Sequence, residues 1–277
     1  MTRLFGIIGH PISHSLSPAM HTAALDALGL DALYAPFELP PRFLRPILQA
    51  LVLAGVEGLN VTVPLKEAVM PLMDRADAAA RAIGAVNTIV IRHRRLTGYN
   101  TDAPGFGMAL RELGLRGGAV DAVILGAGGA ARAVAWELSR QPGSRLTVAN
   151  RDIGRAQRLI RRLSAWRPRV RMRAVALGAV SLRGVEVLVN ATTVGMRSAD
   201  RPLIDPASLD RGTLVYDLVY HRRTALVSAA SHRGCVAANG LSMLLYQGAE
   251  SLRLWLKRAP PLELMRRALE RAVRSTS

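Results

Sequence analysis

Lys66 stands in the stretch LNVTVPLKEAV (residues 59–69) and is one of only two lysines in the chain, against thirty-five arginines. Lysine differs from arginine in one chemically useful way. Its ammonium group can lose a proton near neutral pH when it is desolvated or lies beside another cation, whereas a guanidinium group cannot. A lysine kept where arginine serves elsewhere as the surface cation is therefore a candidate for proton transfer.

Two serines stand two residues apart in GHPISHSLSPAMH (residues 9–21), between an apolar run and a predicted helix. Hydroxyl groups, together with the free N–H groups of a helix N-terminus, can bind a carboxylate. Ser15 and Ser17 are candidates for such a site. The alternative is a turn serine beside an N-cap serine, with Ser17 as the cap and Pro18 at the first helical position.

Amide, hydroxyl and carboxylate side chains also stand in the loops at predicted strand ends. They are Asn60 and Thr62 just before Lys66, Asn87 in GAVNT, and Asp102 in GYNTD. In open α/β sheets, ligands bind outside the carboxyl ends of the parallel strands. Several such groups in successive loops indicate a substrate that carries several hydroxyl groups.

A glycine-rich turn follows the apolar run in VILGAGGAAR (residues 123–132), directly before a predicted helix. Its small residues let the backbone approach a pyrophosphate at the helix N-terminus, where N–H groups and the helix dipole favour anions. The pattern predicts a dinucleotide-binding turn made of Gly126, Ala127, Gly128, Gly129 and Ala130. A tight turn without a ligand is the alternative.

The end of the next predicted strand, LTVANRD (residues 146–152), bears on the type of cofactor. NAD enzymes usually carry an acid there for the ribose 2′-hydroxyl, whereas arginine can pair with the 2′-phosphate of NADP. Asn150 and Arg151 end the strand and Arg155 follows one helical turn later, which favours NADP. Asp152 stands beside them, so NAD stays possible.

Predicted strands and helices alternate along the chain, which is typical of an α/β protein with mostly parallel sheets. In the first half, the pattern predicts a helix over residues 65–82 and then a β-hairpin within residues 84–102. A second alternating set begins near residue 104. The tail from residue 240 is helical, with apolar residues at three- and four-residue spacing.

The composition narrows the class of protein. The chain has 277 residues, enough for two modest domains, and a net charge of +17, which raises the possibility of a nucleic-acid or membrane-surface protein. Dispersed arginines and an aromatic content of 4% weigh against nucleic-acid binding. An anionic substrate or cofactor accounts for the same charge.

The single cysteine, Cys235, excludes an intrachain disulfide, and no Cys/His cluster has the spacing of a zinc site. No apolar run is long enough to span a bilayer, and the N-terminus lacks the shape of a signal peptide. We therefore expect a cytoplasmic protein with no metal and no membrane partner.

The order of the short motifs resembles that of the shikimate dehydrogenase family. The motifs GHPISHSLSPAMH, NVTVPLKE, GAVNT, NTD, GAGGAAR, NR, NATTVGM, YDLVY and GLSMLLYQGAE occur in the family's order over residues 5–256. NVTVPLKE and SLSP are specific to this family and its quinate-using relatives. The resemblance implies a substrate-binding α/β domain (residues 1–103 and 241–277) and a Rossmann-type NADP-binding domain (residues 104–240), with the C-terminal helices returning to the first domain.

The resemblance also implies an activity, the reversible NADPH-dependent reduction of 3-dehydroshikimate to shikimate in chorismate and aromatic amino-acid biosynthesis. Lys66 and Asp102 match the family's catalytic pair. Hydride transfer to a ketone leaves an alkoxide that must gain a proton, and a lysine can give that proton and take it back. We therefore interpret Lys66 as the general acid/base.

Further site residues follow from the resemblance. Those that bind substrate are Ser15 and Ser17 for the carboxylate, Asn60, Thr62, Asn87, Asp102 and Gln247 for the hydroxyls, and Tyr220, which lines the pocket. Those that bind NADP are Gly126, Ala127, Gly128, Gly129, Ala130, Asn150, Arg151, Arg155, Thr192, Leu218, Gly240 and Met243. The expected assembly is a monomer or a homodimer.

Three segments depart from the family pattern: NRD where Asn-Arg-Thr is common, YHRRT (residues 220–224) without the proline after its tyrosine, and NTDAPGF in place of Asn-Thr-Asp-Gly. The first leaves open an NAD-dependent quinate/shikimate dehydrogenase, although Ser17, as serine rather than threonine, favours shikimate. A distant alternative is a basic binding protein on an inactive enzyme scaffold. That alternative predicts lost catalytic side chains, and none is lost.

Overall fold

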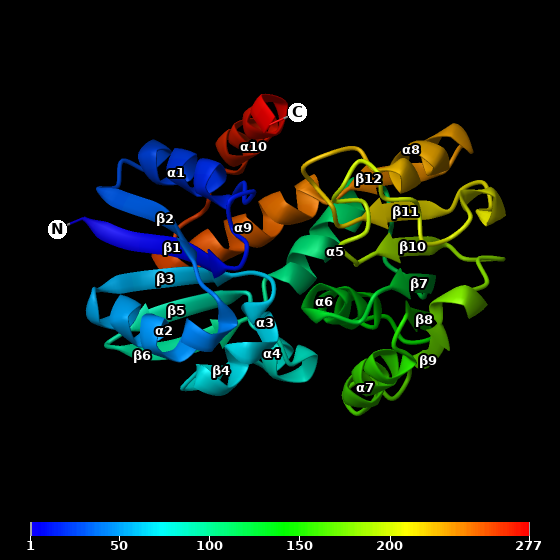
Figure 1. The fold of residues 1–277 in the computed structure, drawn as a ribbon, viewed down its shortest axis with the longest axis horizontal. Helices are drawn as coiled ribbons and strands as arrows, with labels where there is room; N and C mark the ends of the chain where they lie inside the picture. Colours follow the sequence, from blue (N-terminus) through cyan, green and yellow to red (C-terminus); the bar gives the residue numbers. More distant parts are fainter. Residues whose placement is uncertain (1, 277) are drawn as a thin grey trace. The chain divides into compact units, whose positions relative to one another are not determined.

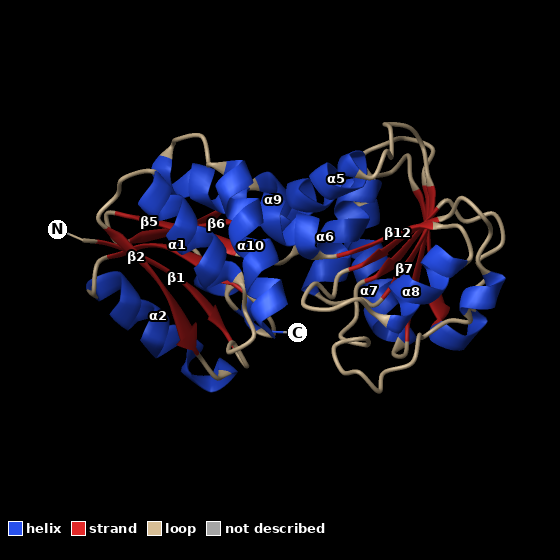
Figure 2. Ribbon diagram, turned by 90° about the horizontal axis from the view of Figure 1, so that it is seen from above, coloured by secondary structure: helices blue, strands red, loops and turns tan. Residues whose placement is uncertain are grey.

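The computed structural model describes residues 2–276. The chain folds into two compact units (Figure 1). The first unit comprises Met1–Gly105 and Leu244–Ser277, and the second comprises Phe106–Met243. In each unit, helices lie on both sides of a sheet (Figure 2). Across residues 2–276, no helix combines the length and the hydropathy that crossing a membrane requires.

The first unit contains one six-stranded sheet and the helices around it. Its strands are β1 (Arg3–Gly9), β2 (Ala32–Glu38), β3 (Val56–Val61), β4 (Arg75–Ala76), β5 (Thr88–Arg92) and β6 (Arg95–Tyr99). Its helices are α1 (Ser17–Ala27), η1 (Pro41–Phe43), α2 (Leu44–Leu53), α3 (Leu65–Ala68), η2 (Met70–Leu72), α4 (Ala78–Ile83) and α10 (Leu262–Thr276). Two longer helices, α5 (Asp102–Glu112) and α9 (Leu241–Leu256), begin in one unit and end in the other.

The sheet of the first unit has the strand order β2-β1-β3-β5-β6-β4. Strands β1, β2 and β3 are parallel, whereas β5 pairs antiparallel with both β3 and β6. The predicted hairpin is therefore present as β5 and β6. Because β5 runs against β3, its first residue lies at the same edge as the carboxyl end of β3, in the register Asn60↔Thr88.

Apolar side chains cover both faces of this sheet, as alternation along the strands requires. Ile8 packs with Leu48 of α2 on one face. Phe5 stacks on Trp255 of α9, with ring centroids 5.3 Å apart. The C-terminal helices thus complete the core of the first unit.

The predicted helix over residues 65–82 is wrong. The segment forms α3, η2, the short strand β4 and α4 instead. Pro71 lacks a backbone N–H and disfavours a continuous helix. A new helix starts where the Asp77 side chain accepts a hydrogen bond from the N–H of Ala80 at 2.7 Å.

The second unit is a six-stranded parallel sheet flanked by helices. Its strands are β7 (Asp121–Leu125), β8 (Arg145–Asn150), β9 (Arg171–Ala176), β10 (Val187–Asn190), β11 (Leu214–Asp217) and β12 (Val236–Asn239). Its other elements are α6 (Gly129–Leu138), α7 (Ile153–Ser164), η3 (Leu177–Ala179), η4 (Pro206–Ser208) and α8 (Ala225–His232).

The strand order in this sheet is β12-β11-β10-β7-β8-β9, with every pair parallel. Counted along the chain from β7, this is the 3-2-1-4-5-6 order of a Rossmann fold. The order reverses between β7 and β10, which is where ligands bind in such sheets. The α/β class predicted from the sequence is confirmed.

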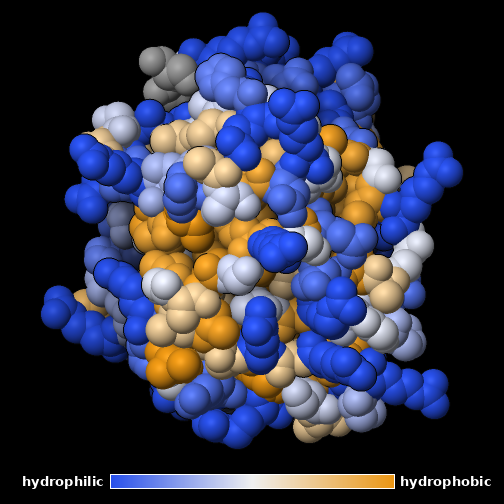
Figure 3. Space-filling view, turned by 90° about the vertical axis from the view of Figure 1, so that its right-hand side faces the viewer, coloured by the Kyte–Doolittle hydropathy of each residue, from blue (hydrophilic) through white to orange (hydrophobic). Residues whose placement is uncertain are grey.

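The face of the molecule in Figure 3 carries hydrophilic side chains around and between areas of apolar ones. This distribution agrees with arginines dispersed along the chain.

Candidate active site

Lys66 and Asp102 form a nearly buried ion pair in the first unit. The ammonium Nζ lies 2.6 Å from Asp102 Oδ2, and the two side chains are 14% and 5% exposed. Lys66 belongs to the short helix α3 after β3, and Asp102 is the first residue of α5 after β6. Because little water reaches the pair, its attraction is screened less than that of a surface ion pair.

Asn87 holds the other oxygen of the same carboxylate. The backbone N–H of Thr101 donates to Asn87 Oδ1 at 2.7 Å, and Asn87 Nδ2 donates to Asp102 Oδ1 at 2.9 Å. A backbone N–H only donates and a carboxylate only accepts, so these two neighbours fix which end of the amide is nitrogen. Each oxygen of Asp102 thus receives one donor.

Gln247 of α9 joins this group from a distant part of the chain. Its Oε1 lies 3.3 Å from Asn87 Nδ2, and its Nε2 donates to the carbonyl of Leu244 at 2.8 Å. The structure therefore brings together four residues singled out in the sequence, Lys66, Asn87, Asp102 and Gln247.

Asn60 lies beside this group and is held at both ends of its amide. Its Oδ1 accepts from the hydroxyl of Tyr34 at 2.8 Å, and its Nδ2 donates to Ser251 Oγ at 2.9 Å. Burial raises the pKa of Tyr34 well above its usual value, so its hydroxyl stays a donor. Sequence reasoning missed Tyr34 and Ser251, since Asn60 lies 26 and 191 positions away from them in the sequence.

His21 stacks on Tyr34 behind Asn60, with ring centroids 4.4 Å apart. It is fully buried, and neither ring nitrogen has a hydrogen-bond partner within residues 2–276. Burial lowers its pKa to about 3, and the nearby Asn60 offsets only part of that shift. His21 is therefore neutral at physiological pH.

Ser15 lies in the loop after β1, and Ser17 is the first residue of α1. The N–H of Ser17 donates to Ser15 Oγ at 3.3 Å. Ser17 is the first residue of the helix rather than its N-cap, and the N-cap residue Leu16 makes no side-chain cap bond. Thr62, which is half-buried, directly follows β3, and its N–H donates to the carbonyl of Ile8 at 2.9 Å.

The glycine turn of the second unit lies between β7 and α6, at the point where the strand order reverses. Gly126 has φ +110°, and a Cβ there would lie 2.9 Å from the carbonyl oxygen of Ala191. At Gly128, the N-cap of α6, a Cβ would meet nothing within 4 Å, and no side chain caps the helix. Open space beside uncapped N–H groups fits the pyrophosphate of a dinucleotide. Ala127, Gly129 and Ala130 complete the turn.

The carboxyl end of β8 carries the residues predicted to distinguish the cofactor. Arg151 and Arg155 are exposed. Asp152 caps α7, because its Oδ1 accepts from the N–H of Arg155 at 3.3 Å, and its Oδ2 lies 3.9 Å from Arg158. The Nδ2 of Asn150 donates to the backbone carbonyl of Asp152 at 2.8 Å. Asp152 thus has a structural role, and Arg158 is a cation that sequence reasoning missed.

A buried carboxylate, Asp217, joins the loops that follow β10 and β11 in the second unit. It accepts from Asn190 Nδ2, Thr224 Oγ1 and the N–H of Val219 at 3.0, 2.7 and 3.1 Å. Burial raises its pKa despite these donors. The loops contain Thr192, whose hydroxyl donates to Asn190 Oδ1 at 2.7 Å, and the half-buried Tyr220.

The remaining predicted cofactor residues lie near the ends of β11 and β12. The N–H of Leu218 donates to the carbonyl of Asn190 at 2.9 Å, and a Cβ on Gly240 would lie 2.3 Å from the carbonyl oxygen of Leu218. The N–H of Met243 donates to the hydroxyl of Tyr216 at 3.1 Å.

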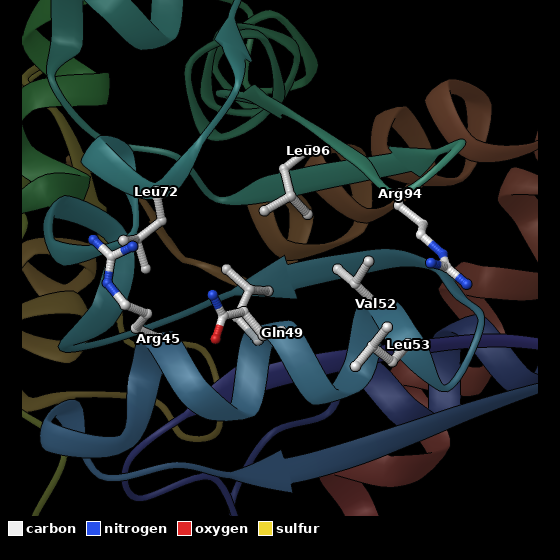
Figure 4. A pocket seen from close by; sticks show the side chains of 8 residues that line it. Arg45, Gln49, Val52, Leu53, Leu72, Arg94 and Leu96 are labelled. Atoms are coloured by element: carbon white, nitrogen blue, oxygen red, sulfur yellow. The ribbon is translucent and has the colours of Figure 1, made fainter.

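A cavity of about 390 Å³ lies elsewhere in the first unit, between α2 and the β5–β6 hairpin (Figure 4). Its lining is mainly aliphatic, with Arg45, Gln49 and Arg94 as the polar members. It contains none of the predicted site residues. In residues 2–276, no group of three or more His, Cys, Asp or Glu side chains could hold a metal ion.

Sequence models of a known family match two parts of the chain. One, described as the shikimate dehydrogenase substrate binding domain, matches residues 7–89. Another, described as the shikimate 5′-dehydrogenase C-terminal domain, matches residues 240–270.

Individual relatives are similar over nearly the whole chain. The shikimate dehydrogenase (NADP(+)) of Rubrobacter xylanophilus is 47% identical over 272 residues, which cover 97% of this chain and 95% of that protein. The crystal structure of shikimate 5-dehydrogenase from Thermus thermophilus in complex with NADP(H) and shikimate has 38% identity and a TM-score of 0.88, with 98% and 100% covered. The structure of quinate dehydrogenase from Corynebacterium glutamicum in complex with NAD has 33% identity and a TM-score of 0.89, with 98% and 99% covered.

Proposed function

Because the chain belongs to the shikimate dehydrogenase family, we infer that it catalyses the reversible NADPH-dependent reduction of 3-dehydroshikimate to shikimate. It is thus an NADP-dependent oxidoreductase acting on a CH–OH group, in aromatic amino-acid biosynthesis. The observation that carries this conclusion is identity of 47% over 97% of the chain to a shikimate dehydrogenase (NADP(+)), together with a nearly buried lysine–carboxylate pair among hydroxyl-binding side chains.

Lys66 and Asp102 form the catalytic pair in this proposal. When the ketone is reduced, its oxygen becomes an alkoxide, and the Lys66 ammonium gives it a proton; in the reverse direction the amine takes that proton back. Asp102 holds Nζ in place at 2.6 Å, and Asn87 holds Asp102. Arginine in place of lysine would keep the charge but could not release the proton.

The polar residues at the same edge of the first sheet bind the rest of the substrate. We assign the carboxylate to Ser15 and Ser17 at the start of α1, and the ring hydroxyls to Asn60, Thr62, Asn87, Asp102 and Gln247. We also assign Tyr220 to the binding of the substrate. A carboxylate suits the N-terminus of a helix that has no side-chain cap.

The second unit binds NADP, which supplies the hydride when bound. The glycine turn from Gly126 to Ala130 holds the pyrophosphate, and Asn150, Arg151 and Arg155 bind the 2′-phosphate side of the adenosine. Thr192, Leu218, Gly240 and Met243 hold the remainder of the cofactor. The role of Asp152 as the α7 cap removes its main conflict with a phosphate, because its carboxylate faces the helix N-terminus and Arg158.

An NAD-dependent quinate/shikimate dehydrogenase is the second candidate. The similarity to a quinate dehydrogenase in complex with NAD favours it, and an acid after β8 is the sequence feature that agrees with it, while the Asp152 carboxylate caps α7 in the structure. A basic binding protein on an inactive scaffold is less well supported, since Lys66 and Asp102 are present and paired.

Other properties are also part of the proposal. The first unit is the substrate-binding domain and the second the NADP-binding domain. The enzyme works in the cytoplasm as a monomer or homodimer, without a nucleic-acid, membrane or metal partner. Its single cysteine, Cys235, is a buried thiol, which suits a reducing compartment.

The test is the rate of nicotinamide reduction by the purified protein, with shikimate or quinate crossed with NADP⁺ or NAD⁺. We expect kcat/KM for shikimate with NADP⁺ to be at least about tenfold higher than kcat/KM for each of the other three combinations. The reason is that the hydrogen bonds between arginine and the 2′-phosphate are charge-assisted. Higher values with NAD⁺ or quinate would instead support the second candidate. Turnover with none of the four pairs would contradict both.

A further inference from the structure

Three buried hydroxyl groups lie behind the amides of Asn60 and Asn87. Thr88 starts β5, Thr101 precedes α5, and Ser251 lies on α9; they are 0%, 2% and 0% exposed. Their oxygens are 3.0 Å apart from Thr88 to Thr101, 2.7 Å from Thr88 to Ser251, and 3.2 Å from Thr101 to Ser251. Strand β5, the residue before α5, and helix α9 thus contact one another through buried hydroxyl groups.

The neighbours of this cluster determine the direction of its hydrogen bonds, because each hydroxyl has one proton. Ser251 donates to the carbonyl of Gln247 at 2.9 Å, which leaves its lone pairs for Thr88 and for Asn60 Nδ2. Thr88 therefore donates to Ser251 at 2.7 Å, since its other acceptor, Asn87 Oδ1, lies at 3.3 Å. Thr88 accepts from Thr101 at 3.0 Å, which is shorter than the 3.2 Å from Thr101 to Asn87 Oδ1. Thr101 in turn accepts from Asn87 Nδ2 at 2.9 Å.

The result is a one-way chain from Asn87 through Thr101, Thr88 and Ser251 to a backbone carbonyl of α9. It takes up one of the two amide protons of Asn87, while the other is on Asp102. Gln247 Oε1 is the competing acceptor, at 3.3 Å against 2.9 Å for Thr101 Oγ1. As long as Thr101 Oγ1 accepts this amide proton of Asn87, both lone pairs of Gln247 Oε1 stay available to other donors.

We propose that Thr101, Thr88 and Ser251 are positioning residues for the reductase reaction. Their hydroxyl chain keeps the Asn87 amide on Asp102 and leaves Gln247 for a substrate hydroxyl. This inference rests on the proposed function, in which Gln247 binds substrate and Asp102 aligns Lys66.

The matched variants are Thr101→Val, which removes the hydroxyl and keeps the shape, and Thr101→Ser, which keeps the hydroxyl. Thr213→Val is the control, since Thr213 is a buried threonine of the second unit that donates to the carbonyl of Val185 at 2.9 Å. In Thr101→Val, we expect kcat/KM for shikimate to fall about tenfold, with KM for shikimate raised and KM for NADP⁺ within about twofold of wild type. Thr101→Ser should restore most of the loss.

Thr88→Val provides a second, milder variant. Without the Thr88 hydroxyl, Thr101 can donate directly to Ser251 at 3.2 Å, so the loss should be smaller than in Thr101→Val. A purely structural hydroxyl would lower the stability of Thr101→Val and Thr213→Val alike and leave KM for shikimate unchanged. That result would overturn the proposal.

A measurement that needs no turnover distinguishes failure of the positioning role from failure of the proposed function. Because the chain has two lysines, isotope-labelled lysine gives two side-chain NMR signals, with the exposed Lys257 as internal reference. We expect the Lys66 signal to move in Thr101→Val and to stay in Thr213→Val and Thr101→Ser. An unmoved signal in Thr101→Val contradicts the positioning role, whether or not shikimate is oxidised.

Discussion

At the scale of single residues, Lys66, the proposed proton donor, is held in one place by its neighbours. A carboxylate at 2.6 Å orients the ammonium, while low exposure keeps water from competing for it. Asp102 is in turn fixed by Asn87, whose orientation is determined by a backbone N–H. The position of the Lys66 ammonium therefore depends on neutral groups as well as on the ion pair.

His21 gives a prediction about pH and stability. Its pKa is lowered to about 3 by burial, below an unfolded value of about 6.5. Its contribution to stability is therefore fully present above about pH 6.5 and is lost as the pH falls toward 3, by up to about 1.4 kcal/mol per pH unit. His21→Phe, which keeps a ring against Tyr34, should flatten this dependence.

The measurement is urea unfolding at several pH values between about 4 and 7, chosen around the usual histidine pKa of about 6.5. His232→Phe, at an exposed histidine of α8, is the matched control. A slope that is the same in wild type and His21→Phe would show that His21 is not responsible for acid lability.

Some of these residues could be predicted from the sequence and others could not. Lys66, Asn87 and Asp102 belong to short motifs at strand ends, where local pattern and resemblance coincide. Ser251 contacts Asn60 across 191 positions of sequence, and no local pattern links them. His21 ends the motif GHPISHSLSPAMH, but its burial depends on the packing of α1, β2 and α9.

At the scale of elements, the sequence indicated the alternation of strands and helices but not every boundary. The β5–β6 hairpin formed as expected, although its turn residues His93 and Arg94 have φ values of +50° and +60° without being glycine. The predicted helix over residues 65–82 is interrupted in the structure, because Pro71 disfavours a continuous helix. The short helix α3 that results is what presents Lys66 at the end of β3.

Gly58 of β3 tests how α9 packs on the first sheet. A Cβ at this position would lie 2.3 Å from Nε1 of Trp255, a side chain that is 1% exposed. The indole cannot move freely, because its Nε1 donates to the carbonyl of Ile89 at 2.9 Å. We expect Gly58→Ala to lower the free energy of unfolding by about 2 kcal/mol, as overpacking does.

Chemical denaturation of Gly58→Ala beside Gly178→Ala measures this effect. At Gly178, in η3, a Cβ would meet nothing within 4 Å, so its change should stay within about 0.5 kcal/mol. Equal stability of the two variants would mean that Trp255 does not occupy the space above Gly58.

At the scale of the whole molecule, the chain ends meet in one unit. Phe5 near the start stacks on Trp255 near the end, and α10 packs on α1. Residue pattern alone could not predict this return, since the contacts join residues 250 positions apart. The resemblance supplied it as an expectation. The charge of +17 would by itself have favoured nucleic-acid binding, yet the family similarity extends over nearly the whole chain.

The rate of NADPH formation from saturating shikimate and NADP⁺, compared between wild type and Lys66→Arg, tests the central claim most directly. Lys257→Arg, at the other lysine of the chain, is the matched control. We predict turnover by wild type and Lys257→Arg, and a rate at least about a hundredfold lower in Lys66→Arg, because the guanidinium group cannot exchange the proton. A Lys66→Arg enzyme as fast as wild type, or a wild type that makes no NADPH, would contradict the account.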